Sequence, residues 1–198
     1  MKRIIAIVIF CSLVSMTSVF SQQGSHVSVQ YDMSFGMGDL GDYISNPSFR
    51  GASFQYRYAV TDNLLIGFDA GWNVFFEKME YDTYTSGTQT LSGVQYRYQN
   101  QVPLLASIDY LLMSDKALQP YIGLGIGTMY SERNLDMGMY RWEENPWHFA
   151  LKPEFGLMYE MSPGTAFKLG LKYYTGFKSG ELDTQGYLTV SVGLAFSF

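Results

Sequence analysis

Large apolar side chains alternate with small or polar ones along most of the chain after residue 25. The last stretch shows this most plainly: every second residue from Leu188 to Phe198 is large and apolar, and those between are small or carry a hydroxyl group. A two-residue period is that of a β-strand with one apolar face. The pattern recurs eight times and predicts strands at residues 26–38, 51–60, 64–74, 94–112, 122–130, 148–160, 167–174 and 186–198.

The segments between these strands alternate in length. Long polar segments cover residues 39–48, 75–92, 131–146 and the approach to Gln185, whereas residues 61–63, 113–119 and 161–164 form short turns. That alternation is typical of an all-β, eight-stranded antiparallel up-and-down transmembrane β-barrel with short periplasmic turns, long extracellular loops and periplasmic termini. No stretch after residue 21 shows the 3.6-residue period of a helix, and Pro153 predicts a bulge or local irregularity in its strand.

Charged residues are confined to one face of the predicted strands. The apolar faces carry no Asp, Glu, Lys or Arg. Lipid contact explains this, because a cationic side chain near the bilayer midplane costs about 2–4 kcal/mol. A soluble barrel of the lipocalin kind, with its apolar face turned inward, is the rival. Its outer face would have no reason to carry so many Gly, Ser and Ala residues.

The polar faces predict a network of charges inside the barrel. An eight-stranded barrel is only wide enough for side chains to fill it, so charges there must pair. A row of inward glycines, Gly123, Gly125 and Gly127, would leave room for large neighbours. We favour a structural plug of ion pairs over a proton or ion path. The network is predicted to contain Asp32, Arg57, Asp69, Arg97, Asp109, Lys152, Glu154, Glu160, Lys168 and Lys172.

The first 21 residues are expected to be a cleaved secretory signal. Lys2 and Arg3 precede a short apolar run, Ile4 to Val14, and Gln22 would begin the mature chain. Eleven apolar residues are too few to span a bilayer, where about 20 are needed. The chain then divides into a signal at 1–21 and one barrel domain at 22–198. Its single cysteine, Cys11, lies in the signal, so the mature chain has no disulfide or thiolate site.

The mature chain is acidic. Without Lys2 and Arg3 it carries 11 basic against 18 acidic residues, which argues against nucleic acid as a partner. Many of the acids fall in the long loops, where they could bridge divalent cations to lipopolysaccharide phosphates, form a protein-binding surface, or make a solvated rim. A surface partner is expected at loops 75–92 and 131–146. No calcium-loop or phosphate-binding motif is present, and we expect no metal or cofactor.

The two histidines are the candidates for catalysis. His26-Val27-Ser28 resembles the His-x-Ser of outer-membrane lipid A deacylases, but the predicted register puts it at the periplasmic end. His148 lies near Glu143 and Glu144 at the outer end, with no Ser or Asp placed by sequence to form a triad. We therefore expect no catalytic residue. An outer-leaflet lipid-modifying enzyme and a narrow channel remain alternatives.

The C-terminal eight residues resemble the closing strand of outer-membrane β-barrels. Ser191, Gly193, Phe196 and Phe198 fit the polar-x-Gly-x-x-apolar-x-aromatic pattern that, in that family, the barrel-assembly machinery reads. With the signal and eight alternating strands, the whole mature chain resembles small barrels of the OmpA/OmpX type. The resemblance implies a bacterial outer-membrane location, contact with lipid and lipopolysaccharide, and a non-enzymatic structural or surface-interaction role.

Overall fold

The computed structural model describes residues 24–86, 89–114, 116–180 and 182–198. The expected signal, residues 1–21, and the expected mature start at Gln22 lie outside them. Three short strands and one short helix lie at the end opposite the short turns, which we call the outer end: β4 (Asp82–Ser86), β5 (Gln89–Gly93), β8 (Tyr140–Glu144) and α2 (Asp39–Tyr43). The long strands are β1 (Ser25–Gly38), β2 (Ser48–Ala59), β3 (Leu64–Lys78), β6 (Gln95–Leu111), β7 (Leu118–Met137), β9 (Trp147–Ser162), β10 (Thr165–Gly176) and β11 (Gln185–Ser197).

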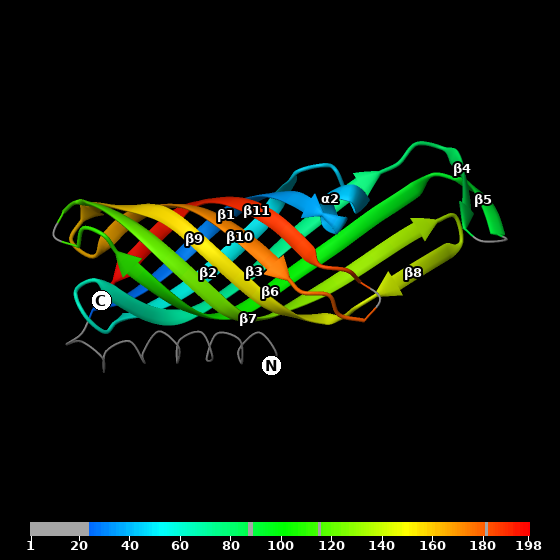
Figure 1. The fold of residues 1–198 in the computed structure, drawn as a ribbon. Helices are drawn as coiled ribbons and strands as arrows, with labels where there is room; N and C mark the ends of the chain where they lie inside the picture. Colours follow the sequence, from blue (N-terminus) through cyan, green and yellow to red (C-terminus); the bar gives the residue numbers. More distant parts are fainter. Residues whose placement is uncertain (1–23, 87–88, 115, 181) are drawn as a thin grey trace, which may run out of the picture.

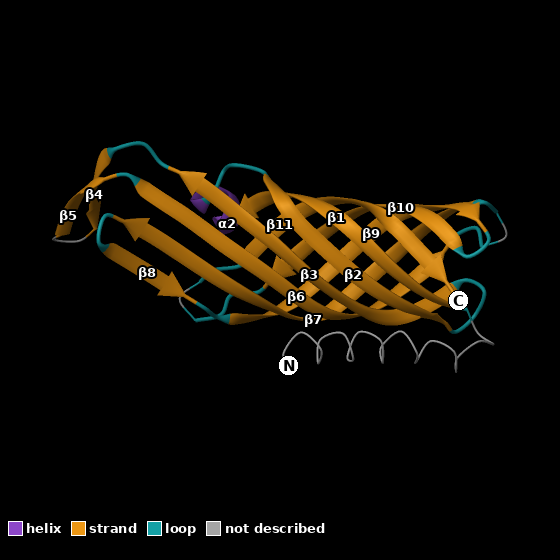
Figure 2. Cartoon of the chain, turned by 180° about the vertical axis from the view of Figure 1, so that it is seen from behind, coloured by secondary structure: helices purple, strands orange, loops and turns teal. Residues whose placement is uncertain are grey.

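The eight long strands close into an antiparallel barrel (Figures 1 and 2). Each pairs with its neighbours in chain order, β11 returns to pair with β1 from His26↔Ser197 to Gly38↔Gln185, and β6 pairs with β7. The predicted eight-stranded up-and-down barrel is confirmed. The C-terminus lies at the end with the short turns (Figure 2). Within the described residues, no helix is both long and apolar enough to cross a membrane.

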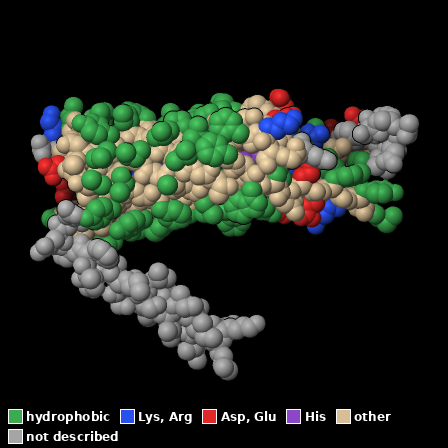
Figure 3. All heavy atoms as spheres, turned by 60° about the horizontal axis from the view of Figure 1, so that its bottom comes forward, with side chains coloured by type: hydrophobic (Ala, Val, Ile, Leu, Met, Phe, Trp, Pro, Cys, Tyr) green, Lys and Arg blue, Asp and Glu red, His purple; other side chains and the backbone are tan. Residues whose placement is uncertain are grey.

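The two faces of the wall have opposite chemistry. Outward side chains such as Val29, Ile108 and Leu124 are about half exposed and form an apolar band, with the charged side chains gathered at its two ends (Figure 3). Inward side chains are mainly polar and buried, including Gln30, Ser107 and others. The soluble alternative, with its apolar face turned inward, is therefore wrong.

The long segments 75–92 and 131–146, predicted as loops, are instead mostly strands. β3 and β6 continue their pairing to Lys78↔Tyr96, and β7 runs on to pair with β8. β4 and β5 form a separate hairpin. Beyond the apolar band the outward face of the strands meets water instead of lipid, so nothing selects for outward apolar residues there and the strand period is lost. The result is a sheet of β3, β6, β7 and β8 that projects past the rest of the barrel (Figure 1).

Pro153 interrupts the ladder without shifting the register. β9 and β10 pair at Lys172↔Glu154 and at Thr175↔Leu151, but not at the positions between them. Pro153 still faces Leu124 of β7 on its other side. The predicted irregularity is confirmed as a local gap, which follows from the missing N–H of proline.

Candidate functional site

A compact group of charges fills the middle of the barrel. Arg57 of β2 donates to Asp69 (2.5 Å) and Asp109 (2.6 Å), so one guanidinium joins three strands. Lys152 of β9 contacts Asp69 as well, and its ammonium lies 2.5 Å from Glu154. All five of these side chains are buried. A charge taken out of water is stabilised only when it is paired, and here each has a partner.

Two more lysines extend the group along the barrel axis. Lys168 lies 3.9 Å from Glu154 and donates to the amide oxygen of Gln55 at 2.6 Å. Lys172 lies 3.5 Å from Asp32. Four acids and four bases therefore balance inside the wall. We call this group the interior network: Asp32, Arg57, Asp69, Asp109, Lys152, Glu154, Lys168 and Lys172.

The inward glycines of β7 make room for this network. A methyl group at Gly123 would lie 2.4 Å from a carboxylate oxygen of Asp109, and one at Gly125 would lie 3.2 Å from the Lys152 side chain. Larger residues at these positions would displace the charges. The space that the glycine row predicts is therefore occupied by network side chains.

The other two predicted members lie elsewhere. Glu160 is exposed at the short-turn end, where it borders a hollow of about 200 Å³ together with His26. Arg97 lies near the outer mouth, donates to the carbonyl of Tyr43 at 2.9 Å and stacks over the Tyr43 ring at 5.1 Å. Both point to the polar side of their strands, but they lie above or below the network, because the side of a strand does not fix the height along it.

The segment after β1 folds back into the barrel mouth as a plug. Gly38, with φ of 58°, starts the turn, and a left-handed φ of this kind favours glycine. Helix α2 follows, and Leu40 and Ile44 are fully buried. They pack in one apolar layer with Phe75, Leu105, Met129, Ala150, Tyr174 and Tyr187. This layer lies at the outer mouth and closes the interior a second time. The sequence interpretation missed it, although Leu40 and Ile44 are spaced four apart in a polar segment.

Polar contacts fasten the plug to the wall. Arg133 donates to Asp39 at 2.6 Å, and Gln185 donates to the same carboxylate at 2.7 Å. Partial burial of Asp39 opposes ionisation, but these two hydrogen bonds prevail and lower its pKa. The guanidinium of Arg133 also lies 4.3 Å from the centre of the Tyr43 ring. Burial raises the pKa of the Tyr43 hydroxyl to about 12.

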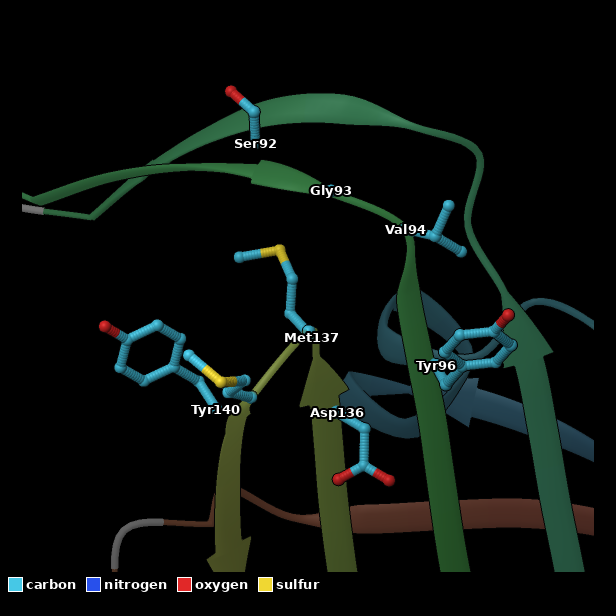
Figure 4. A pocket seen from close by; sticks show the side chains of 9 residues that line it. Ser92, Gly93, Val94, Tyr96, Asp136, Met137 and Tyr140 are labelled. Atoms are coloured by element: carbon cyan, nitrogen blue, oxygen red, sulfur yellow. The ribbon is translucent and has the colours of Figure 1, made fainter.

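Beyond the plug, the projecting sheet carries an apolar groove. The groove lies between the β4–β5 hairpin and the turn from β7 to β8, and has a volume of about 410 Å³. Figure 4 shows Met137 pointing up toward Gly93, with Tyr140 beside it. The neighbouring Met139 is 97% exposed. Exposed apolar side chains outside a lipid band are typical of interaction surfaces.

Each histidine ring is held by a hydrogen bond at its Nδ1 atom. The Nδ1 of His26 lies 2.7 Å from the hydroxyl of Ser197, and the Nδ1 of buried His148 lies 2.7 Å from the carbonyl oxygen of Phe177. Across the described ranges, no hydrogen bond joins either ring to a carboxylate. In the same ranges, no group of three or more His, Cys, Asp or Glu side chains could hold a metal ion.

Three residues of the predicted assembly signal lie on β11, and the fourth, Phe198, directly follows it. Ser191 points inward and donates to the carbonyl of Gly170 at 3.2 Å. Gly193 lies against β1, where a methyl group would be 2.1 Å from the carbonyl oxygen of Val29. Phe196 and Phe198 point outward and are 43% and 44% exposed.

Comparisons with known proteins identify the fold and family. The Neisserial surface protein A has a similar structure, with a TM-score of 0.58, 16% identity, and coverage of 88% of this chain and 97% of that one. The attachment invasion locus protein Ail of Yersinia pestis, solved with the heparin analogue sucrose octasulfate, gives a TM-score of 0.57 and 16% identity over 89% of this chain and 99% of that one. The outer membrane protease OmpT of Escherichia coli has a TM-score of 0.52 and 10% identity, with coverage of 90% of this chain and 98% of that one.

A comparison with curated proteins finds no match. The structural neighbours share the fold at low identity and include a protease, so they do not assign an activity. The model of the outer membrane protein beta-barrel domain matches residues 6–198. The chain therefore belongs to the outer membrane protein β-barrel domain family, whose members lie in the bacterial outer membrane.

Proposed function

We propose that this protein is a non-enzymatic outer-membrane barrel that acts through its projecting sheet, as a surface-interaction protein. One observation carries the proposal: the interior is closed at two levels, by the interior network and by the plug, while β3, β6, β7 and β8 project beyond it. With the interior closed, the accessible chemistry lies on the outside. The short-turn end, with the C-terminus, then faces the periplasm.

The membrane-embedded part has a structural role in this proposal. Its apolar band contacts outer-membrane lipid, and its rim meets lipopolysaccharide. The barrel-assembly machinery is the partner during insertion, through Ser191, Gly193, Phe196 and Phe198. The enzyme alternative is less well supported, because within the described residues neither histidine ring is hydrogen-bonded to a carboxylate, and the Ser197 hydroxyl that His26 contacts lies at the short-turn end.

Charge at the outer end favours a partner that is not a polyanion. Six described bases lie there: Arg50, Lys78, Arg97, Arg133, Arg141 and Lys178. The ten described acids are Asp39, Asp42, Glu77, Glu80, Asp82, Glu132, Asp136, Glu143, Glu144 and Asp183. Three of the bases are held in ion pairs, by Asp39, Asp136 and Asp183. This end is therefore poorly suited to a sulfated ligand like the one in the structure of Ail, and a protein partner suits its charge better.

A closed interior predicts no sustained ion conduction. Purified protein in planar bilayers is expected to give no steady single-channel current, because an ion would have to displace paired charges and the apolar layer around Leu40 and Ile44. The measurement is single-channel recording at both polarities. A steady, ion-selective current from the unaltered protein would replace this proposal with the channel alternative.

Shortening the projecting sheet at its far end is expected to weaken surface binding and leave the barrel folded. A two-residue Asn-Gly turn can join two residues that already pair across neighbouring strands. Asn-Gly can therefore replace residues 80–94, because the backbone N–H of Met79 donates to the carbonyl of Gln95. It can also replace residues 134–143, because Arg133 pairs with Glu144. We expect attachment of protein-bearing vesicles to cultured-cell membranes, and to vesicles bearing the same protein, to fall about tenfold. Heat-modifiable gel mobility should be retained, because loop-length changes cost little.

The matched control is Pro163→Asn, which creates the same Asn-Gly turn at the opposite end. This control should attach like the unaltered protein. Attachment that persists in the shortened variant, or that is equally lost in the control, would contradict a role for the projecting sheet.

A further inference from the structure

Strand β8 has an open edge. Among the described strands it pairs with β7 alone, from Arg133↔Glu144 to Met137↔Tyr140. The strand that continues it, β9, pairs on its other side with β10, but that pairing ends at Gly176↔Ala150, below β8. The first four residues of β8 are exposed. Such an edge presents unpaired N–H and C=O groups to which another strand can add.

The sequence of this edge is complementary to itself. When β8 is placed antiparallel to a second β8 about Trp142, Arg141 faces Glu143 of the other copy, and the reverse pair forms as well. Trp142 then faces Trp142, and Tyr140 faces Glu144. Opposite charges and aromatic pairs directly across antiparallel strands are both stabilising. We infer that β8 is a homotypic docking edge, which joins two copies of this chain by antiparallel strand addition.

The existing contacts of β8 suit this arrangement. Arg141 already donates to Asp136 of β7 at 2.6 and 2.8 Å, so the second Glu143 would complete a row of acid, base and acid across three strands. On the opposite face, Tyr140 and Trp142 stack with their ring centres 5.9 Å apart. Their exposed fractions, 55% and 46%, leave aromatic surface to bury.

Geometry restricts the two copies to facing membranes. Antiparallel strands in one sheet are related by a two-fold axis perpendicular to that sheet. Strand β8 continues the line of the barrel wall (Figure 1), so this axis lies close to the membrane plane and the rotation reverses the direction of the barrel. Copies in one membrane point the same way and cannot form this contact. The docking edge therefore joins membranes of neighbouring cells or vesicles.

The edge is short, so a single contact is weak and many are needed. Five residues from each copy pair, and a membrane that displays many copies converts weak contacts into firm attachment through avidity. This inference rests on the proposed surface-interaction function and names its partner as a second copy of the chain.

Charge exchange between two vesicle populations tests the inference. One population of phosphatidylcholine vesicles carries the Arg141→Glu variant, and the other carries Glu143→Arg. Both variants also carry Asp136→Asn, so that the ion pair between Arg141 and Asp136 within one copy does not affect the comparison. Each population alone places like charges opposite each other, and we expect its aggregation, measured by light scattering, to fall about tenfold. In the mixture, the two acids on the edge of one variant face the two bases on the edge of the other, so aggregation should return to that of Asp136→Asn alone.

The outcomes separate this inference from the proposed function. If the mixture aggregates no better than its components, or if vesicles with the unaltered protein do not aggregate, the homotypic edge is overturned. If such vesicles still attach to cultured-cell membranes through the projecting sheet, the proposed function stands with another partner. If they attach to neither surface, both fall. Retained heat-modifiable mobility of each variant shows that the barrel is folded in every case.

Discussion

Replacing Lys152 by Met is expected to lower the free energy of unfolding by about 3–5 kcal/mol, since removal of one partner leaves a buried charge uncompensated. The Lys152 ammonium contacts both Asp69 and Glu154, and its side chain is fully buried. Without Lys152, Asp69 would still be paired with Arg57. The nearest remaining cation to Glu154 would be Lys168, at 3.9 Å, and its other contacts would be hydrogen bonds from Tyr121 and Gln55. The measurement is urea unfolding in detergent micelles, in which the folded fraction is read from heat-modifiable gel mobility.

Two further variants make the test specific to burial. Lys178→Met removes a lysine whose ion pair with Asp183 is exposed, and it should leave stability unchanged. The double variant Lys152→Met with Glu154→Gln restores the charge balance of the interior network and should recover part of the loss. Equal stability of Lys152→Met and Lys178→Met would show that the interior charges are not what holds the wall together.

The barrel could be predicted because lipid imposes a rule on every residue that faces it. Within the apolar band, outward positions must be apolar and inward ones must fit a narrow interior, so the two-residue period is continuous. Even its exceptions have a physical reason. Leu105 and Leu111 interrupt the polar face of β6, and both are buried inside the barrel, in two separate apolar clusters.

The outer end could not be predicted in the same way. Asn100 interrupts the apolar face of β6 where the strand leaves the band, and its side chain donates to Glu132 instead of meeting lipid. Beyond this point the outward face meets water instead of lipid, so the strands β4, β5 and β8 carry no periodic signal. Helix α2 is too short to show a helical period, and only its burial reveals the plug.

The interior network could be predicted in kind but not in membership. Alternation places a charge on the inner side of a strand, yet its height depends on register and tilt, which the sequence does not give. Glu160 therefore reaches the open short-turn end, and Arg97 fastens the plug through Tyr43.

Changing Gly193 to Ala is expected to destabilise the barrel itself, by about 3 kcal/mol, whether or not assembly machinery is present. The added methyl group would lie 2.1 Å from the carbonyl oxygen of Val29 and 2.7 Å from the Cα of Gln30. Both are backbone atoms, so no side-chain rotation relieves the clash, and β1 and β11, the strands that close the barrel, must move apart. Refolding of the purified protein from urea into detergent micelles measures the loss.

Phe198 separates closure of the barrel from recognition during insertion. Its side chain is 44% exposed, so Phe198→Ala should refold in micelles like the unaltered protein but reach lower levels in the outer membrane of cells if the machinery reads it. Gly24→Ala is the matched glycine control, because a methyl group there would have nothing within 4 Å. Normal refolding of Gly193→Ala would show that β1 and β11 can adapt to the clash. If Phe198→Ala fails to refold in micelles, the terminal ring stabilises the fold. If Phe198→Ala and the unaltered protein reach equal levels in the outer membrane of cells, the match to the assembly pattern is accidental.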